Sequence, residues 1–187
     1  ALKLTSTASN NVAVGTLAMG ANTTGSENVA IGKCALVTNT TASNNVAVGE
    51  IALRVNTTGA CNTAVGRSAL AANTTASNNT AVGILALSAN TTGTTNVAIG
   101  RKTMCTNTTG DKNTAIGNQS LEQNTTADNN IAVGFSTMLN NTTGAENNAL
   151  GNSALCANTT GTNNVALGHI ALRANTTADN NTAVGMS

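Results

Sequence analysis

The stretch Asn11-Val12-Ala13-Val14-Gly15, followed seven residues later by Asn22-Thr23-Thr24, is repeated along the whole chain. Its first asparagine recurs every 17 residues without insertion or deletion, so that ten complete units span 11–180. A period of this length predicts a solenoid or a repeat array. We therefore expect residues 1–10 to be a lead-in from a preceding coil and 11–187 to be one repeat domain. Its units start at residues 11, 28, 45, 62, 79, 96, 113, 130, 147, 164 and 181, the last being truncated.

The ten units show which positions tolerate change when that asparagine is counted as position 1. Positions 1, 3 and 5 are always Asn, Ala and Gly, and positions 12 to 14 are always Asn-Thr-Thr. Position 4 is always Val, Ile or Leu, and position 9 is always Leu or Met. Charged residues of the units occur only at positions 6, 7, 10, 16 and 17. Because packed interiors are sensitive to a single methylene, the pattern predicts that the fixed small and aliphatic positions are packed and the variable ones face water.

A unit of 17 residues is too short for a helical hairpin, and its glycine and Asn-Thr-Thr cluster would break a helix. Two short strands and two turns do fit. We expect one strand at positions 1–4, with positions 3 and 4 on opposite faces, and a second strand at positions 7–10 with position 9 inside. Positions 11–17 have the composition of a wide turn. The predicted fold is an all-β parallel β-roll or β-solenoid of ten to eleven coils, about 50 Å long.

Such a coil buries two sizeable aliphatic side chains and a few alanines, which stabilises it by only a few kcal/mol against the entropy of ordering its backbone. A single chain therefore looks marginally stable. Ladders of stacked Asn and Thr side chains would stabilise it further. We also expect the alanine faces to pack against neighbouring chains.

The composition narrows the functional classes. The chain has one Phe, no Trp, Tyr or Pro, and a formal net charge of +1. It lacks the basic face that binding of nucleic acid requires. It also lacks the run of about 18 apolar residues that a transmembrane helix needs, so we expect no membrane insertion. The start is not that of a signal peptide and has no initiator Met. Because the pattern begins and ends mid-unit, we expect the chain to be a piece of something longer.

The four cysteines do not form a recognisable framework. Cys34, Cys61, Cys105 and Cys156 fall at positions 7, 17, 10 and 10, and no Cys-x-x-Cys occurs. Cys105 and Cys156 lie three coils apart, about 14 Å, which exceeds the reach of a disulfide. They are interpreted as free thiols, with a link between neighbouring chains as the alternative.

Each Asn-Thr-Thr is formally an acceptor for N-glycosylation, but ten glycans stacked at about 5 Å would crowd one another. We expect instead a ladder of turn side chains that bond to the backbone and to one another, with partial glycosylation left open. The rows of Thr23, Thr24 and their equivalents also suggest an ice-binding face, although adjacent Thr residues in a turn point different ways. Representative ladder residues are Asn22, Thr23, Thr24, Asn90, Thr91, Thr92, Asn158, Thr159 and Thr160.

Candidates for catalysis or metal binding are weak. His169 occupies position 6, where Thr16 and Phe135 also occur, so an exposed surface histidine is expected rather than a catalytic base. No unit gathers a nucleophile, a base and an orienting acid. Acids at position 16 recur irregularly as Asp111, Asp128 and Asp179, and they lack the Gly-Gly-x-Gly-x-Asp pattern of calcium-loaded solenoids. We expect them to cap turns, and we expect no enzyme, cofactor or metal site.

The unit Asn-Val-Ala-Val-Gly…Ala-Leu…Asn-Thr-Thr-Gly resembles the β-roll repeats of trimeric autotransporter adhesin heads and, more closely, repeats of phage tail fibres and related virion fibres. Units such as Asn62 to Gly66 and Asn90 to Gly93 carry the likeness, which covers about residues 11–185. It implies a left-handed β-roll, three chains side by side, and a role in reaching or adhering to a surface. The period differs from the shorter one of adhesin heads, and a stalk, anchor, binding tip and trimerisation chaperone are missing from the sequence.

The expected function is a non-catalytic structural or adhesive fibre segment on a virion or outside a cell. Its expected partners are itself, as a homotrimer or fibre, and a host surface glycan or receptor. Residues from the variable positions are the candidates for surface contact, namely Arg67, Arg101, Lys102, Phe135 and His169. Two alternatives remain: a monomeric ice- or surface-binding solenoid, and a segment of a self-assembling extracellular filament, since solenoids without polar caps tend to stack.

Overall fold

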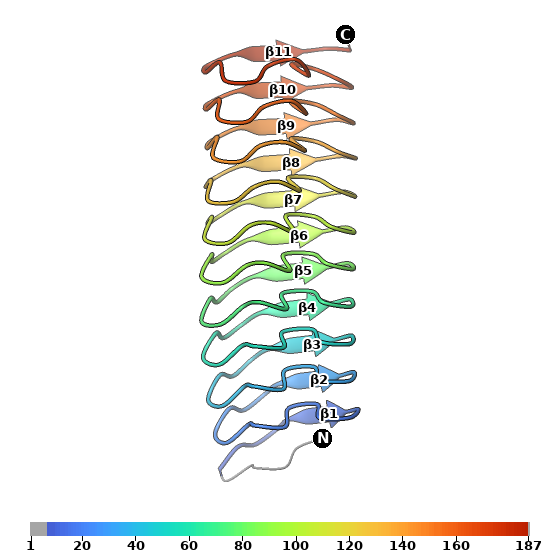
Figure 1. Ribbon diagram of the computed structural model, residues 1–187, viewed down its shortest axis with the longest axis vertical. Helices are drawn as coiled ribbons and strands as arrows, with labels where there is room; N and C mark the ends of the chain where they lie inside the picture. The colour runs from blue at the N-terminus through green and yellow to red at the C-terminus, as the bar shows by residue number, and fades with distance from the viewer. Residues whose placement is uncertain (1–6, 187) are drawn as a thin grey trace.

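The computed structural model describes residues 7–186, and its coils stack in one straight column (Figure 1). Eleven strands form a single parallel sheet in strict sequence order. Their bounds are β1 Val12–Val14, β2 Val29–Ile31, β3 Val46–Val48, β4 Thr63–Val65, β5 Thr80–Val82, β6 Val97–Ile99, β7 Thr114–Ile116, β8 Ile131–Val133, β9 Asn148–Leu150, β10 Val165–Leu167 and β11 Thr182–Val184. The register is one unit per strand, with Val12 opposite Val29 and Ala13 opposite Ala30. The predicted parallel β-solenoid of 17-residue coils is confirmed.

Residues 1–6 of the predicted lead-in lie outside the described range. Ser9, which precedes the first complete unit, stands at position 16 of a preceding coil. Its carbonyl accepts a hydrogen bond of 3.0 Å from the backbone N–H of Glu27, and the same bond joins Asn44 to Ser26 one coil later. The repeat pattern therefore begins before Asn11.

Each coil has one strand, not two. The strand covers positions 2–4, and the second strand predicted at positions 7–10 is wrong, because this segment is a turn. Its backbone passes twice through the left-handed region, with φ of 62° at Leu85 and 49° at Leu87 in the fifth unit. A strand requires extended φ throughout. The two left-handed residues curl the segment and carry the position-9 side chain back under the sheet.

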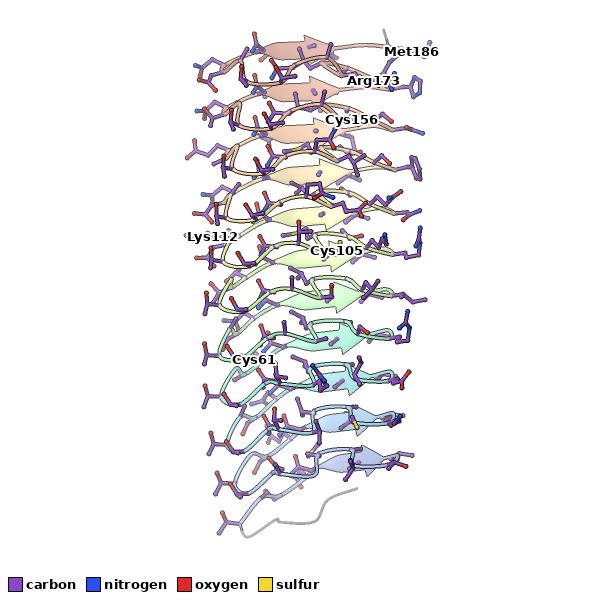
Figure 2. The ribbon with its side chains drawn as sticks, viewed as in Figure 1. Cys61, Cys105, Lys112, Cys156, Arg173 and Met186 are labelled. Atoms are coloured by element: carbon purple, nitrogen blue, oxygen red, sulfur yellow. The ribbon has the colours of Figure 1, made fainter. Side chains whose placement is uncertain are left out.

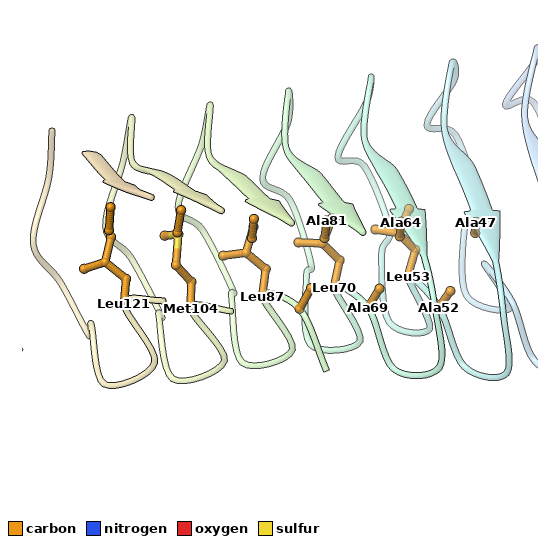
Figure 3. Packing of buried hydrophobic residues seen from close by; sticks show 14 of the residues in the cluster. Ala47, Ala52, Leu53, Ala64, Ala69, Leu70, Ala81, Leu87, Met104 and Leu121 are labelled. Carbon is orange, nitrogen blue, oxygen red and sulfur yellow. The ribbon is translucent and has the colours of Figure 1, made fainter. Parts of the chain in front are cut away.

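The interior is a single file of small and aliphatic side chains (Figure 3). Ala81 at position 3, Ala86 at position 8 and Leu87 at position 9 are fully buried, and their equivalents form one continuous cluster. Figure 3 shows Leu53, Leu70 and Leu87 rising from the return segment toward the strands. Both alanines of a coil are therefore covered by their own chain. The expectation that alanine faces pack against neighbouring chains is wrong.

The aliphatic residues at position 4 point outward, contrary to the prediction that they are packed within the coil. Val14 is 56% exposed, and Leu150 is 52% exposed. Because successive strand residues alternate between faces, burial of Ala at position 3 turns positions 2 and 4 to the outside together. Each coil thus buries one large aliphatic side chain, at position 9.

The invariant glycine at position 5 sits where neighbouring backbones come closest. Gly66 has φ of 132°, and a Cβ added there would lie 2.5 Å from the carbonyl oxygen of Gly83 in the next coil. That separation is below any real contact distance for a Cβ atom, and the backbone conformation itself disfavours L side chains. Both features explain why no unit has another residue at this position.

Candidate functional surfaces

The Asn of each Asn-Thr-Thr lies inside the coil and forms a continuous ladder. In the fifth unit, Nδ2 of Asn90 donates to Oδ1 of Asn73 at 3.0 Å and to the carbonyl of Gly93 at 2.9 Å. Its own Oδ1 accepts a hydrogen bond of 2.9 Å from Nδ2 of Asn107. Asn22 and Asn158 occupy the same position and are also fully buried. Buried amides with this degree of pairing stabilise one side-chain arrangement and one register.

A second asparagine ladder, at position 1, was not singled out from the sequence. Oδ1 of Asn79 accepts a hydrogen bond of 3.0 Å from the backbone N–H of Asn96, and its Nδ2 donates to the carbonyl of Gly93 at 2.9 Å. The Gly93 carbonyl therefore accepts from two buried amides, Asn79 and Asn90. The invariance of position 1 was the signal, since a strand residue facing water would not need to be Asn in every unit.

The two threonines that follow the ladder asparagine have different environments. Oγ1 of Thr91 donates to the carbonyl of Thr108 in the next coil at 3.0 Å, and Thr23 and Thr159 make the equivalent bond. The second threonines, Thr24, Thr92 and Thr160, are exposed. The ladder therefore consists of the Asn and the first Thr, while the second Thr forms an outer row.

This arrangement bears on the two alternatives for Asn-Thr-Thr. In the folded chain the amide nitrogen of Asn90 is fully buried and already donates two hydrogen bonds, so it is no acceptor for a glycan. Of the two threonine rows, the first is half-buried with its hydroxyls bonded to backbone, and only the second is exposed. The rows do not form one flat face.

Short polar side chains at position 16 tie neighbouring turns together. Oδ1 of Asp128 accepts a hydrogen bond of 2.7 Å from the backbone N–H of Asp111, and Oδ1 of Asp179 accepts one of 2.6 Å from Thr162. Where Ser stands at this position its hydroxyl does the same, as Ser77 does for the N–H of Ala60. Asp111 itself accepts from the N–H of Thr94. These acids cap turns of the preceding coil.

The outer face of the sheet presents a stripe of mostly aliphatic side chains, which we name the aliphatic stripe. It consists of positions 2 and 4 of the eleven strands: Val12, Val14, Val29, Ile31, Val46, Val48, Thr63, Val65, Thr80, Val82, Val97, Ile99, Thr114, Ile116, Ile131, Val133, Asn148, Leu150, Val165, Leu167, Thr182 and Val184. It runs the length of the sheet, about 50 Å by about 10 Å. Contiguous apolar surface of this extent on a water-exposed protein marks an interaction site.

One edge of the column carries the variable rim, the residues at position 6. Four of the five residues selected as surface contacts stand there in alternate coils, about 10 Å apart: Arg67, Arg101, Phe135 and His169. All four are exposed. In Figure 2 Lys112, at position 17, lies at the left edge of the column, on the side from which the strand arrows point away. The variable rim is a single mixed row with cationic, aromatic and apolar members.

The fifth selected residue, Lys102, belongs to a small polar cluster on the return segment. Its Nζ lies 3.7 Å from Oε1 of Glu122, whose Oε2 accepts a hydrogen bond of 2.7 Å from Nε2 of Gln119. Glu122 is only 8% exposed, contrary to the expectation that charged position-10 residues face water. The sequence could have indicated this burial, because Lys102 and Gln119 stand at position 7 of successive units and Glu122 stands at position 10, on the same segment of the coil.

Cys105 touches the same cluster, with Sγ 4.0 Å from Oε1 of Glu122. Burial raises the pKa of the Cys105 thiol, the Glu122 carboxylate raises it further, and Lys102 opposes them. A thiol held in its protonated form is a poor nucleophile and a poor metal ligand. The cluster is therefore a local ion-pair network and not an activated thiol.

All four cysteines are free, and Cys61 is the exposed one. Within residues 7–186 there is no pocket, no group of three or more His, Cys, Asp and Glu side chains able to hold a metal ion, and no helix long and apolar enough to cross a membrane. The candidate functional features of the described residues are therefore three surfaces: the aliphatic stripe, the exposed threonine row and the variable rim.

Comparisons of the chain with models of protein families, with curated proteins and with solved structures found no match.

Proposed function

We propose that this chain is a non-catalytic structural or adhesive fibre segment, located on a virion or outside a cell, in which copies associate side by side through the aliphatic stripe. The observation that carries the proposal is the stripe itself. Val12 in β1 is 48% exposed and Ile131 in β8 is 47% exposed, on a sheet whose other face packs against the interior. Covering such a surface with another apolar surface is favourable, because it removes apolar area from water.

The size of the stripe fits contact between copies. Its plan area is about 500 Å², so two stripes face to face cover about 1,000 Å² in total, which reaches the lower limit for a specific interface. Because every coil presents the same outward positions, one copy matches another along the whole column. Three copies around one axis, as the resemblance implies, would bring all stripes into a shared interior.

The same geometry supports a role in contact with a surface. A rod with one face buried between copies leaves its edges outward, and the variable rim is one of those edges. We propose that Arg67, Arg101, Phe135 and His169 contribute to contact with a glycan or receptor of a host surface. The interior holds no variation of this kind, since its positions are fixed by the two asparagine ladders.

Sedimentation velocity at micromolar concentration tests the proposal. The wild-type chain is expected to sediment as a trimer. Ile131→Lys, on the stripe, is expected to give a monomer with unchanged circular dichroism, because its side chain already points to solvent within one chain. Thr126→Lys, on the exposed threonine row of the preceding unit, is the matched control and should remain trimeric.

A monomeric wild-type chain would overturn the proposal, and so would a trimer that Ile131→Lys leaves intact. Polymers with a broad length distribution would favour the end-to-end filament instead.

A further inference from the structure

Asn148 is the one amide in the aliphatic stripe. It stands at position 2 of the ninth unit and is the first residue of β9, where other units have Val, Ile or Thr. Its backbone N–H donates to the carbonyl of Asn164 at 2.8 Å. The side chain is exposed and makes no hydrogen bond within the described residues. The stripe residues around it, Ile131, Leu150 and Val165, are aliphatic.

If other copies of the chain cover the stripe, as the proposed function requires, the Asn148 amide becomes buried among aliphatic side chains. A buried amide without a hydrogen-bond partner is costly. We propose that Asn148 side chains of associated copies hydrogen-bond to one another and thereby fix a parallel, in-register arrangement of the chains.

The need for such a residue follows from the regularity of the stripe. Copies can slide past one another by one coil, about 4.8 Å, and still place Val, Ile, Leu and Thr side chains, which all present methyl groups, on one another. Apolar contact alone therefore discriminates poorly between registers, as in other repetitive interfaces where a single buried polar residue selects the register. Slipping by one coil would put Asn148 against Ile131 or Val165 of another copy and leave the amide unpaired.

Orientation is decided by the same residue. If two columns packed antiparallel and centred, β9 of one copy would face β3 of the other, because these are the third strands from opposite ends of an eleven-stranded sheet. Asn148 would then meet Val46. In a cyclic assembly, equal residues of all copies lie at equal height. There the amide meets its own equivalents, and because it carries both donors and acceptors it can pair with them.

Distance measurement between spin labels tests this inference. Cys61 is exposed and stands at position 17, which is not a stripe position, so it can carry the label once Cys34, Cys105 and Cys156 are replaced by Ser. Serine is native to their positions in other units, as at Ser68 and Ser88. The labelled wild-type assembly is expected to give one narrow distribution of distances between copies. Asn148→Val is expected to keep the trimer but broaden that distribution or add longer distances, since slipped and antiparallel arrangements become acceptable.

Two variants separate this role from a general effect of altering the stripe. Thr114→Val, on β7, removes a polar stripe residue of another kind and should leave the distribution narrow. Adding Val46→Asn to Asn148→Val moves the amide from β9 to β3 and should restore a single narrow distribution. An Asn148→Val trimer with an unchanged, narrow distribution would overturn the role of Asn148 while leaving the fibre proposal standing. A monomeric wild-type chain would overturn both.

Discussion

At the scale of single residues, the fold depends on asparagines that no other side chain replaces. Asn79 and Asn90 converge on the carbonyl of Gly93, and each also bonds to the equivalent residue of a neighbouring coil. The amide supplies a donor and an acceptor in one plane. One asparagine side chain can therefore bond to the carbonyl of a turn and also to the equivalent asparagine of a neighbouring coil. Serine or threonine would be too short, and aspartate lacks the donor.

Asn90→Asp makes that requirement measurable. The introduced carboxyl would face two acceptors, Oδ1 of Asn73 and the carbonyl of Gly93, so its folded-state pKa should be raised above the ordinary value of about 3.9. The folded state then keeps a proton that the unfolded state has released. Stability should therefore be highest below about pH 4 and fall as pH rises through the folded-state pKa, with a loss of about 3 kcal/mol or more at pH 7.

Urea unfolding at several pH values measures this dependence. Asn44→Asp provides the control, because Asn44 is exposed at position 17 and should change stability by less than about 0.5 kcal/mol. Equal stability of both variants at pH 7 would contradict the structural importance of the ladder donors.

At the scale of the coil, the single strand and the curled return segment have separate structural roles. The strand supplies the parallel backbone ladder, and the return segment lifts its position-9 side chain into the space beneath the sheet. The turn is itself hydrogen-bonded, with the N–H of Asn90 donating to the carbonyl of Leu87 at 3.2 Å. Each coil therefore depends heavily on one aliphatic side chain.

Leu87→Ala is expected to destabilise the chain by about 2–5 kcal/mol, because it removes the one large aliphatic side chain that is fully buried in the fifth coil. Ile84→Ala, three residues earlier on the variable rim, removes a side chain that is 44% exposed and should cost less than about 1 kcal/mol. Chemical denaturation compares the two. A small loss for Leu87→Ala would show that the coil collapses around the missing side chain.

At the scale of the whole molecule, the solenoid is one-dimensional, because each strand contacts only the strands before and after it. Stability then comes from coil-by-coil terms and from contacts between neighbours. Coils in the middle have neighbours on both sides, and Leu70 and Leu87 there are fully buried, whereas Leu172 in the tenth unit is only partly buried.

Hydrogen exchange should follow this gradient. Backbone amides of residues 62–112 are expected to exchange most slowly, and those of 164–185 faster by at least about tenfold, since local opening of an end coil breaks contacts on one side only. Mass spectrometry of peptic fragments resolves the regions. Uniform exchange along the chain would indicate that all coils open together.

The sequence by itself determined the period, the parallel register, the turn composition and the inward place of position 9. The period and the register follow because a strict repeat without insertions can stack in only one way. The inward place of position 9 follows because this position is always Leu or Met and never carries a charged residue. Alternation along a strand also implied that positions 2 and 4 share a face. It did not say which face is inside.

Tertiary structure decided that question. The space beneath the sheet holds Leu87 and Ala86, which leaves room for the methyl group of Ala81 but not for the larger residues beside it. Val82 and its equivalents therefore face outward, and a stripe suited to contact between copies results. The convergence of Asn79 and Asn90 on one carbonyl and the burial of Glu122 also depend on segments that meet only when the coil closes, so spacing along the chain could not reveal them.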